Sequence, residues 1–67
     1  MEQIWNSERI KHTRMAYGWS QKDLADRLGV TDAHISMIES GLRSPSNALI
    51  KKMAKLFRVR LSTLLAK

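Results

Sequence analysis

Apolar residues recur at helical spacing in short blocks along the chain, and small polar residues or glycine separate the blocks. Ser20 is suited to cap a helix over residues 21–28, and Gly29 is suited to end it in the left-handed conformation. The apolar face of this helix comprises Leu24, Ala25 and Leu28. Thr31 is suited to cap a second helix over residues 32–39, so the pattern leaves almost no loop between the two helices.

The remaining blocks predict three further helices: one within residues 4–17 that starts near Ser7 or Glu8, and two over residues 47–57 and 61–66. Gly18 can end the first of these, and either Ser44 or Ser46 can cap the second. No stretch alternates apolar and polar residues for long enough to predict a strand, and the best candidate, 59–61, is too short to pair alone. We therefore expect residues 1–67 to form one all-α domain of five helices.

The two central helices have the spacing of a helix-turn-helix. Helices that cross at about 90–120° through a tight turn need a small residue where they meet and a turn residue that tolerates positive φ. Ala25 and Gly29 meet these needs. Three apolar residues can hold the second helix against the core: Val30, Ile35 and Ile38. The offsets together predict a helix-turn-helix over residues 21–40 rather than a generic helical bundle.

Much of the chain also resembles the XRE family of helix-turn-helix proteins, which includes the phage lambda repressor and Cro. The resemblance lies in four stretches: RIKHTRMAYGWSQKDLADRLGV (9–30), ISMIESG (35–41), SPS (44–46) followed by LIKKMAKLF, and LSTLL (61–65). It implies a compact, lambda-repressor-like DNA-binding domain in which residues 32–39 form a recognition helix for the major groove. Two residues near the last turn depart from the family pattern: Arg58 stands where glycine is frequent, and Arg60 where a serine or threonine cap is usual.

The predicted recognition helix turns a polar face outward, opposite Ile35 and Ile38. Four residues on this face are predicted to contact bases: Asp32, Ala33, Ser36 and Met37. A carboxylate can accept a hydrogen bond from cytosine, a hydroxyl can bond several base edges, and alanine or methionine can contact a thymine methyl group. Two alternatives stay open, since Asp32 can instead complement the helix dipole and Met37 can be a solvent-facing spacer. Because the face lacks glutamine, asparagine and arginine, we expect modest direct readout supported by DNA shape.

Five residues beside this helix are predicted to contact DNA phosphates: Gln21, His34, Ser40, Arg43 and Ser46. Helix N-termini attract anions, and the family resemblance assigns Gln21, which opens the helix over 21–28, to a phosphate. Two of the five have alternatives, since Arg43 can enter the minor groove and His34 can meet a base. Three lysines of the fourth helix are expected to be solvated charges, with contact of one of them to a phosphate as the alternative: Lys51, Lys52 and Lys55.

The resemblance also implies a structural ion pair, because Arg14 and Glu39 match an arginine and a glutamate that pair in the family. Such a pair would tie the first helix to the end of the recognition helix.

The last predicted helix carries more apolar surface than a small core needs, since a chain of this length buries only about 60% of its unfolded surface. Three leucines are candidate dimer contacts: Leu61, Leu64 and Leu65. Packing inside the chain is the alternative for Leu61 and Leu64, so Leu65 is the preferred contact with a partner copy.

The charge of the chain is unevenly distributed. The formal net charge is +6, divided into −1 over residues 1–39 and +7 over residues 40–67, where no acidic residue occurs. This asymmetry favours a polyanionic partner, either nucleic acid or an acidic membrane surface, although a merely solvated basic surface would have the same composition. The helix-turn-helix spacing favours DNA, and no apolar run approaches the length of a membrane helix.

The sequence offers no catalytic or cofactor chemistry. Cysteine is absent, and no metal-ligand cluster, carboxylate pair or phosphate-binding glycine loop occurs, so we expect no enzyme, no cofactor and no metal. We expect a cytoplasmic, nucleoid-associated transcriptional regulator that binds double-stranded DNA sequence-specifically, most simply a repressor acting as a homodimer on a palindromic operator. The alternative is an antitoxin-type module that binds a protein partner as well as DNA.

Overall fold

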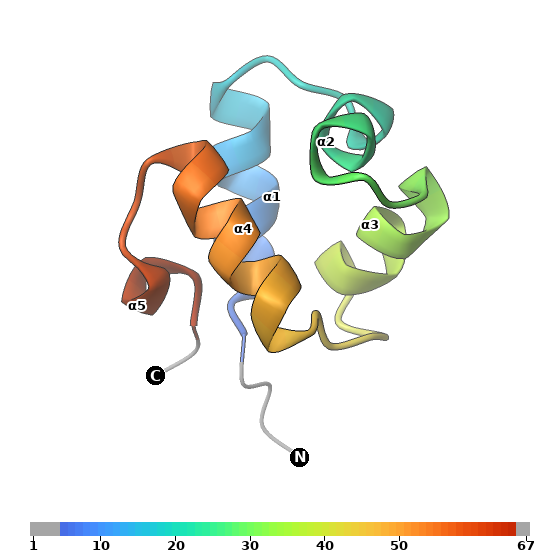
Figure 1. Ribbon diagram of the computed structural model, residues 1–67. Coiled ribbons are helices and arrows are strands. Elements are labelled where there is room, and N and C mark those ends of the chain that lie inside the picture. Colours follow the sequence, from blue (N-terminus) through green and yellow to red (C-terminus); the bar gives the residue numbers. More distant parts are fainter. Residues whose placement is uncertain (1–4, 66–67) are drawn as a thin grey trace.

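The computed structural model describes residues 5–65, which form five α-helices (Figure 1). The helices are α1 (Ser7–Ala16), α2 (Gln21–Leu28), α3 (Asp32–Glu39), α4 (Asn47–Phe57) and α5 (Leu61–Leu64). The all-α prediction is confirmed, and the bounds of α2, α3 and α4 agree with the predicted ones to the residue. Within residues 5–65 the longest helix has 11 residues, and none is long and apolar enough to cross a bilayer.

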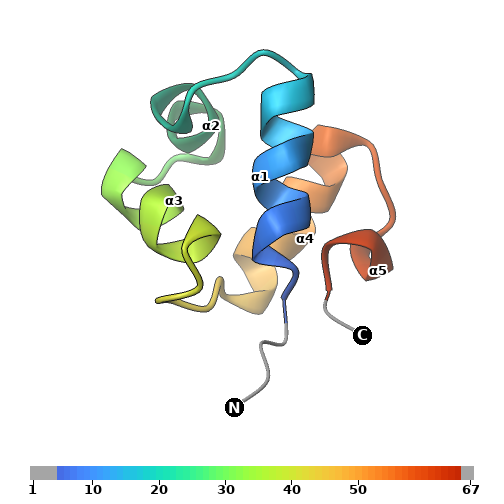
Figure 2. The same ribbon diagram turned by 180° about the vertical axis from the view of Figure 1, so that it is seen from behind.

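The helices α2 and α3 pack against each other on one side of the molecule, while α5 packs beside α4 on the opposite side (Figures 1 and 2). The first helix contacts both α3 and α5 and therefore lies between these two sides. Since α4 also contacts α2, the α2–α3 pair rests on a support built from α1 and α4. This arrangement leaves α3 at the margin of the molecule.

All five helices contribute to one apolar core. The largest fully buried side chains are Ile10, Leu24, Ile35, Ile38, Met53, Phe57 and Leu64. Burying a side chain of this size stabilises a fold by about 1.5–3 kcal/mol. The apolar faces predicted for residues 21–28 and 32–39 both lie in this core, and so they fix which side of α3 points outward.

A side chain caps the N-terminus of each of the four longer helices. The caps are Asn6, Ser20, Thr31 and Ser46, whose side-chain oxygens accept backbone amides at 2.9, 3.0, 3.2 and 3.1 Å. Ser46, and not Ser44, therefore caps α4. Asn6 was not among the predicted caps, although asparagine directly before a helix is a known signal.

The end of α2 combines a left-handed residue with a contact from α4. Gly29 has a φ of 75°, and the amide of Val30 bonds to the carbonyl oxygen of Ala25 at 3.0 Å. Lys52 donates from Nζ to the carbonyl oxygen of Leu28 at 3.0 Å. Lys52 is exposed, as expected of a solvated charge, but it also completes the C-terminus of α2, a contact that the sequence did not predict.

The last helix is shorter than the predicted span of 61–66. It ends at Leu64, and Leu65 has an extended backbone with φ −94° and ψ 147°. The physical reason is a long-range pairing, because Leu65 forms an isolated antiparallel bridge with Trp5. Ala66, the last residue of the predicted span, lies outside the described residues.

Candidate nucleic-acid interface

Three residues connect α2 to α3, and each has a separate role. Gly29 adopts the left-handed conformation that ends α2, Val30 packs half buried against the core, and Thr31 caps α3. Ala25, the small residue predicted to allow close approach of the two helices, is buried. The geometry is that of a helix-turn-helix, with α3 as its second helix.

The outer face of α3 is open to solvent. Asp32, Ala33 and Ser36 are exposed and Met37 is half buried, while Ile35 and Ile38 on the opposite face have no exposed surface. The four residues predicted to contact bases thus share a face that the chain itself leaves accessible. A carboxylate, a hydroxyl and two apolar groups on one helix face can meet base edges in a major groove.

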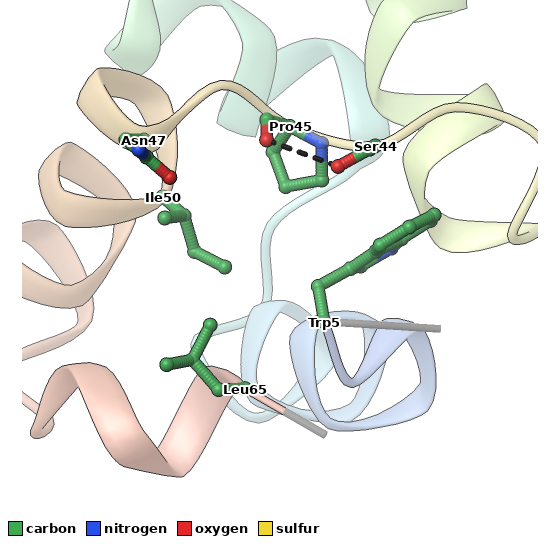
Figure 3. Close-up of a pocket in the computed structure, with 6 residues that line it drawn as sticks. All are labelled: Trp5, Ser44, Pro45, Asn47, Ile50 and Leu65. Carbon is green, nitrogen blue, oxygen red and sulfur yellow. Dashed lines mark hydrogen bonds between the residues drawn. The ribbon is translucent and has the colours of Figure 1, made fainter. Parts of the chain in front are cut away.

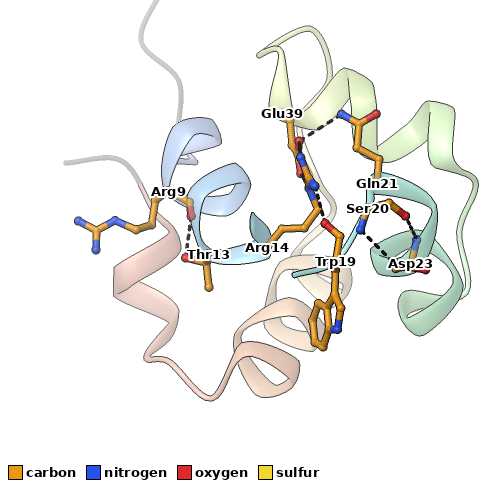
Figure 4. A network of polar contacts seen from close by, with 8 residues as sticks. All are labelled: Arg9, Thr13, Arg14, Trp19, Ser20, Gln21, Asp23 and Glu39. Atoms are coloured by element: carbon orange, nitrogen blue, oxygen red, sulfur yellow. Dashed lines mark hydrogen bonds and ion pairs between the residues drawn. The ribbon is translucent and has the colours of Figure 1, made fainter. Parts of the chain in front are cut away.

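A buried ion pair holds the far end of α3 against α1 (Figure 4). Arg14 donates from Nε to Oε2 of Glu39 at 2.7 Å and from Nη2 to Oε1 at 3.0 Å, and the two side chains are only 10% and 3% exposed. The same guanidinium donates from Nη1 to the carbonyl oxygen of Trp19 at 2.6 Å. The pair implied by the resemblance is present, and its bidentate geometry fixes both partners.

The same carboxylate also links α3 to the start of α2. Gln21 donates from Nε2 to Oε1 of Glu39 at 3.2 Å, and its side chain is half buried (Figure 4). Sequence reasoning missed this contact, since it assigned Gln21 to a phosphate. Glu39 therefore ties both α1 and α2 to the end of α3.

The other residues predicted to contact phosphates lie in α3 and in the segment that follows it. His34 is half buried, while Arg43 is exposed. Ser40 donates from Oγ to the carbonyl oxygen of Met37 at 3.1 Å, and Ser46 caps α4. Both serines are nevertheless exposed, so each remains accessible to a ligand at the surface.

The indole of Trp5 makes a further contact with the end of α3. Trp5 is 8% exposed and donates from Nε1 to the carbonyl oxygen of Ile38 at 3.0 Å. The segment before α1 is thereby fastened to the recognition helix. The sequence does not predict this contact, because the partner carbonyl lies 33 positions away along the chain.

Aromatic side chains join the turn before α2 to the end of α4. Tyr17 and Trp19 stack with ring centroids 4.6 Å apart, and both rings also stack on Phe57. Tyr17 donates its hydroxyl to the carbonyl oxygen of Phe57 at 2.7 Å, and the guanidinium of Arg27 lies 4.3 Å from the centre of the Trp19 ring. These contacts position α2, the helix that carries the turn to α3.

The N-terminus of α2 is a reciprocal capping box (Figure 4). Ser20 accepts the amide of Asp23 at 3.0 Å, and the Asp23 carboxylate accepts the amide of Ser20 at 2.9 Å. The backbone hydrogen bond from Ser20, followed by the bond to its hydroxyl, lowers the pKa of Asp23 below its ordinary value of 3.8. The carboxylate is therefore held in its charged form beside the positive end of the helix dipole.

The three leucines proposed as dimer contacts have different surroundings. Leu64 has no exposed surface and Leu61 packs half buried against the core, so the alternative of packing inside the chain describes both. Leu64 cannot offer its side chain to a partner. Leu65 is 37% exposed, and it borders a small hollow lined also by Trp5, Ser44, Pro45, Asn47 and Ile50 (Figure 3).

An all-α fold with a tightly joined helix pair, whose second helix presents an exposed polar face, defines a helix-turn-helix DNA-binding domain of transcriptional regulators. Residues 10–64 match the helix-turn-helix family model HTH_3, and the chain belongs to this XRE-type family.

Relatives and solved structures agree with this assignment. A relative described as an uncharacterized HTH-type transcriptional regulator, from Archaeoglobus fulgidus, is 38% identical over 56 residues, which are 84% of this chain and 80% of the relative. The structure of the biofilm regulator SinR in complex with DNA is similar with a TM-score of 0.79 and 32% identity, over 87% of this chain and 97% of that chain. The P22 c2 repressor with a synthetic operator has a TM-score of 0.80 over 87% of this chain and 89% of that chain. At 24% identity that last likeness concerns the fold alone.

Proposed function

We propose that this protein is a repressor that binds a palindromic operator as a homodimer, with α3 of each copy in the major groove. The observation that carries the proposal is the exposed outer face of α3, backed by the buried pair of Arg14 and Glu39. Asp32, Ala33 and Ser36 are accessible on that face. A recognition helix reads base edges with its N-terminal residues. Asp32 and Ala33 lie in the first turn of α3, and Ser36 lies one turn further on the same face.

Phosphate contacts on both sides of α3 would fix the docking of the domain. We assign them to the N-terminus of α2, opened by Gln21, and to the segment after α3 with Ser40, Arg43 and Ser46. His34 would contact the backbone beside the groove. Arg43 is the strongest of these candidates, since it is exposed and a guanidinium can bind a phosphate in bidentate fashion.

The homodimer is supported by the exposed part of Leu65 and by the hollow beside it. A homodimer places two recognition helices on one face of the duplex, with half-sites about 34–36 Å apart or a multiple of that distance. A dimer bound at a promoter would exclude the polymerase from the same DNA, which is the simplest form of repression.

Selection of bound duplexes from a random-sequence pool tests the proposal. The expected result is an enriched inverted repeat with a half-site spacing of about 10–10.5 base pairs or a multiple. The variant Ser36→Ala should change the preferred base at one position of each half-site. Recovery of unenriched sequences would contradict sequence-specific binding, and a single unrepeated half-site would contradict the homodimer.

Sedimentation tests the dimer surface separately. Leu65→Glu should shift the protein toward monomer, because a charge would replace apolar contact area. Met15→Glu is the matched control, since Met15 is also exposed, at 56%, but lies on α1. Equal sedimentation of the Leu65 variant and the unchanged protein would rule out this surface.

A further inference from the structure

The connection between α4 and α5 differs from the C-termini of α1, α2 and α3 in the residue that adopts the left-handed conformation. At the end of each of α1 to α4 one residue is left-handed, and the amide of the residue directly after it bonds to the carbonyl oxygen five residues earlier. The left-handed residues are Gly18 (φ 74°), Gly29 (φ 75°), Gly41 (φ 82°) and Arg58 (φ 58°). All three glycines of the chain occupy this position, and the fourth helix has an arginine instead. A side chain with Cβ is strained in this conformation.

The same connection also departs from the rule at the N-termini. Side-chain oxygens cap α1, α2, α3 and α4, whereas α5 follows Arg60, which makes no side-chain cap hydrogen bond. Serine or threonine is preferred at such a position, and here the amide of Thr63 bonds instead to the backbone carbonyl oxygen of Arg60 at 2.9 Å. This connection therefore departs from two local preferences within three residues: glycine at the left-handed position, replaced by Arg58, and a side-chain cap before the next helix, replaced by Arg60.

Neither arginine has a structural role that offsets these departures. Arg58 and Arg60 are both exposed, and the ion pairs within residues 5–65 involve neither of them. Val59 between them is half buried and packs against the core, so the turn is anchored while its two charges face solvent. Lys55, in the last turn of α4, adds a third exposed cation. Local rules are broken in folded proteins mainly where function requires it.

These charges lie too far from α3 to assist docking there. Figures 1 and 2 place α3 and the connection between α4 and α5 at opposite sides of the molecule, whose smallest extent is 20 Å. Exposed charges are screened beyond about 8 Å at physiological ionic strength. A phosphate bound at residues 58–60, which we call the arginine turn, would therefore belong to a DNA segment other than the one in contact with α3.

The chemistry of the arginine turn favours phosphate over a protein surface. Guanidinium groups bind phosphates in bidentate fashion and are preferred in nucleic-acid recognition. Arginine is also frequent in protein interfaces, but there it lies in a well-packed, desolvated centre together with aromatic residues. The apolar residues of this connection, Val59 and Leu61, are half buried against the core, and the exposed ones are cationic or polar.

We propose that the arginine turn, with Lys55, binds the backbone of a second DNA duplex, so that the protein bridges two DNA segments. The proposal rests on the DNA-binding function of α3. It predicts binding to the second duplex without sequence preference, because the contacts reach phosphates only.

A capture assay tests the bridging. One duplex is fixed on beads, a second labelled duplex is in solution, and the label retained by the full chain is measured at several salt concentrations. In the variant Arg58→Gly/Arg60→Ser, retained label should fall roughly tenfold, and the slope of bridging against the logarithm of salt should fall by about two. Arg58→Lys/Arg60→Lys is the matched control, since it keeps both charges and should retain most of the bridging.

Two further measurements separate this inference from folding and from the function of α3. The Gly/Ser variant should melt at or above the temperature of the unchanged protein, because both substitutions suit the backbone better. Its affinity for a single duplex should stay within about twofold, since the removed charges are screened from that site.

Two outcomes would overturn the inference while the function of α3 stands. In the first, the unchanged protein binds single duplexes but retains no second one. In the second, the Gly/Ser variant bridges two duplexes as well as the unchanged protein. Equal bridging would also be the outcome if the turn bound an acidic protein instead. Failure to bind any duplex would contradict the proposed function itself.

Discussion

Lys52 of α4 donates a hydrogen bond to the carbonyl oxygen of Leu28, so a charged side chain of α4 caps the C-terminus of α2. The ammonium group lies at the negative end of the α2 dipole, where positive charge is stabilising. The contact sits directly before the turn to α3. It therefore helps to set the direction in which the recognition helix leaves α2.

Replacing Lys52 by methionine should lower the free energy of unfolding by about 1 kcal/mol, because a charged hydrogen-bond donor at a helix end is lost. Urea denaturation measures the change. Lys51→Met is the matched control, since Lys51 is the adjacent exposed lysine and its loss should leave stability within about 0.5 kcal/mol. Equal stability of the two variants would show that the contact contributes nothing.

Glu39→Ala should destabilise the fold far more, by about 3–5 kcal/mol, because it leaves the guanidinium of Arg14 buried without its partner. Thermal unfolding followed by circular dichroism measures this loss. Asp26→Ala removes a second ion pair of residues 5–65, in which Asp26 lies 3.6 Å from Lys22 and both side chains are more than half exposed. That control should cost at most about 0.5 kcal/mol. A melting curve of Glu39→Ala as high as that of the control would contradict the role of the buried pair.

The capping box predicts a dependence of stability on pH. Because the pKa of Asp23 is lowered in the folded protein, its contribution is present above the ordinary value of 3.8 and is lost as the pH falls through the folded value. The destabilisation caused by Asp23→Ala, measured by urea unfolding, should therefore be larger at about pH 7 than at about pH 2.5. Ser20→Ala, which removes the hydroxyl that the carboxylate faces, should weaken the same dependence. An effect of Asp23→Ala that does not vary with pH would argue against this account.

Arg43→Ala should weaken binding to all DNA sequences alike and reduce the slope against the logarithm of salt by about one, since one phosphate contact is removed. Fluorescence anisotropy with several duplexes provides both quantities. Lys11→Ala removes an equal charge from the exposed surface of α1 and should leave the slope nearly unchanged. If the arginine variant instead changes the preferred sequence, then Arg43 contacts bases or the minor groove.

The helix-turn-helix could be predicted because its signals are local. Ser20 and Thr31 precede helices directly, Gly29 ends one directly, and the periodicity of Ile35 and Ile38 fixes the inner side of α3. The exposure of the opposite face then follows from geometry alone. The sequence could therefore place the four residues predicted to contact bases on the outer face of α3. Their contacts with bases remain a prediction.

The contacts that were missed join residues far apart in sequence. Gln21 and Glu39 are separated by 18 positions, and Lys52 and Leu28 by 24, so only the packing of helices brings them together. The early end of α5 has the same origin, because Leu65 pairs with Trp5 at the other end of the described chain. A lysine or glutamine in the sequence does not indicate which carbonyl or carboxylate it will meet.

The hydrogen bond from the Trp5 indole to Ile38 gives the protein an internal optical probe. Tryptophan emission depends on the polarity around the ring and on the hydrogen bond of its nitrogen, and this ring lies in a nearly dry site at the end of α3. Any ligand that shifts α3 must disturb that site. In a Trp19→Phe variant, which keeps Trp5 as its one tryptophan, the emission wavelength should therefore report on the surroundings of the end of α3 without a label.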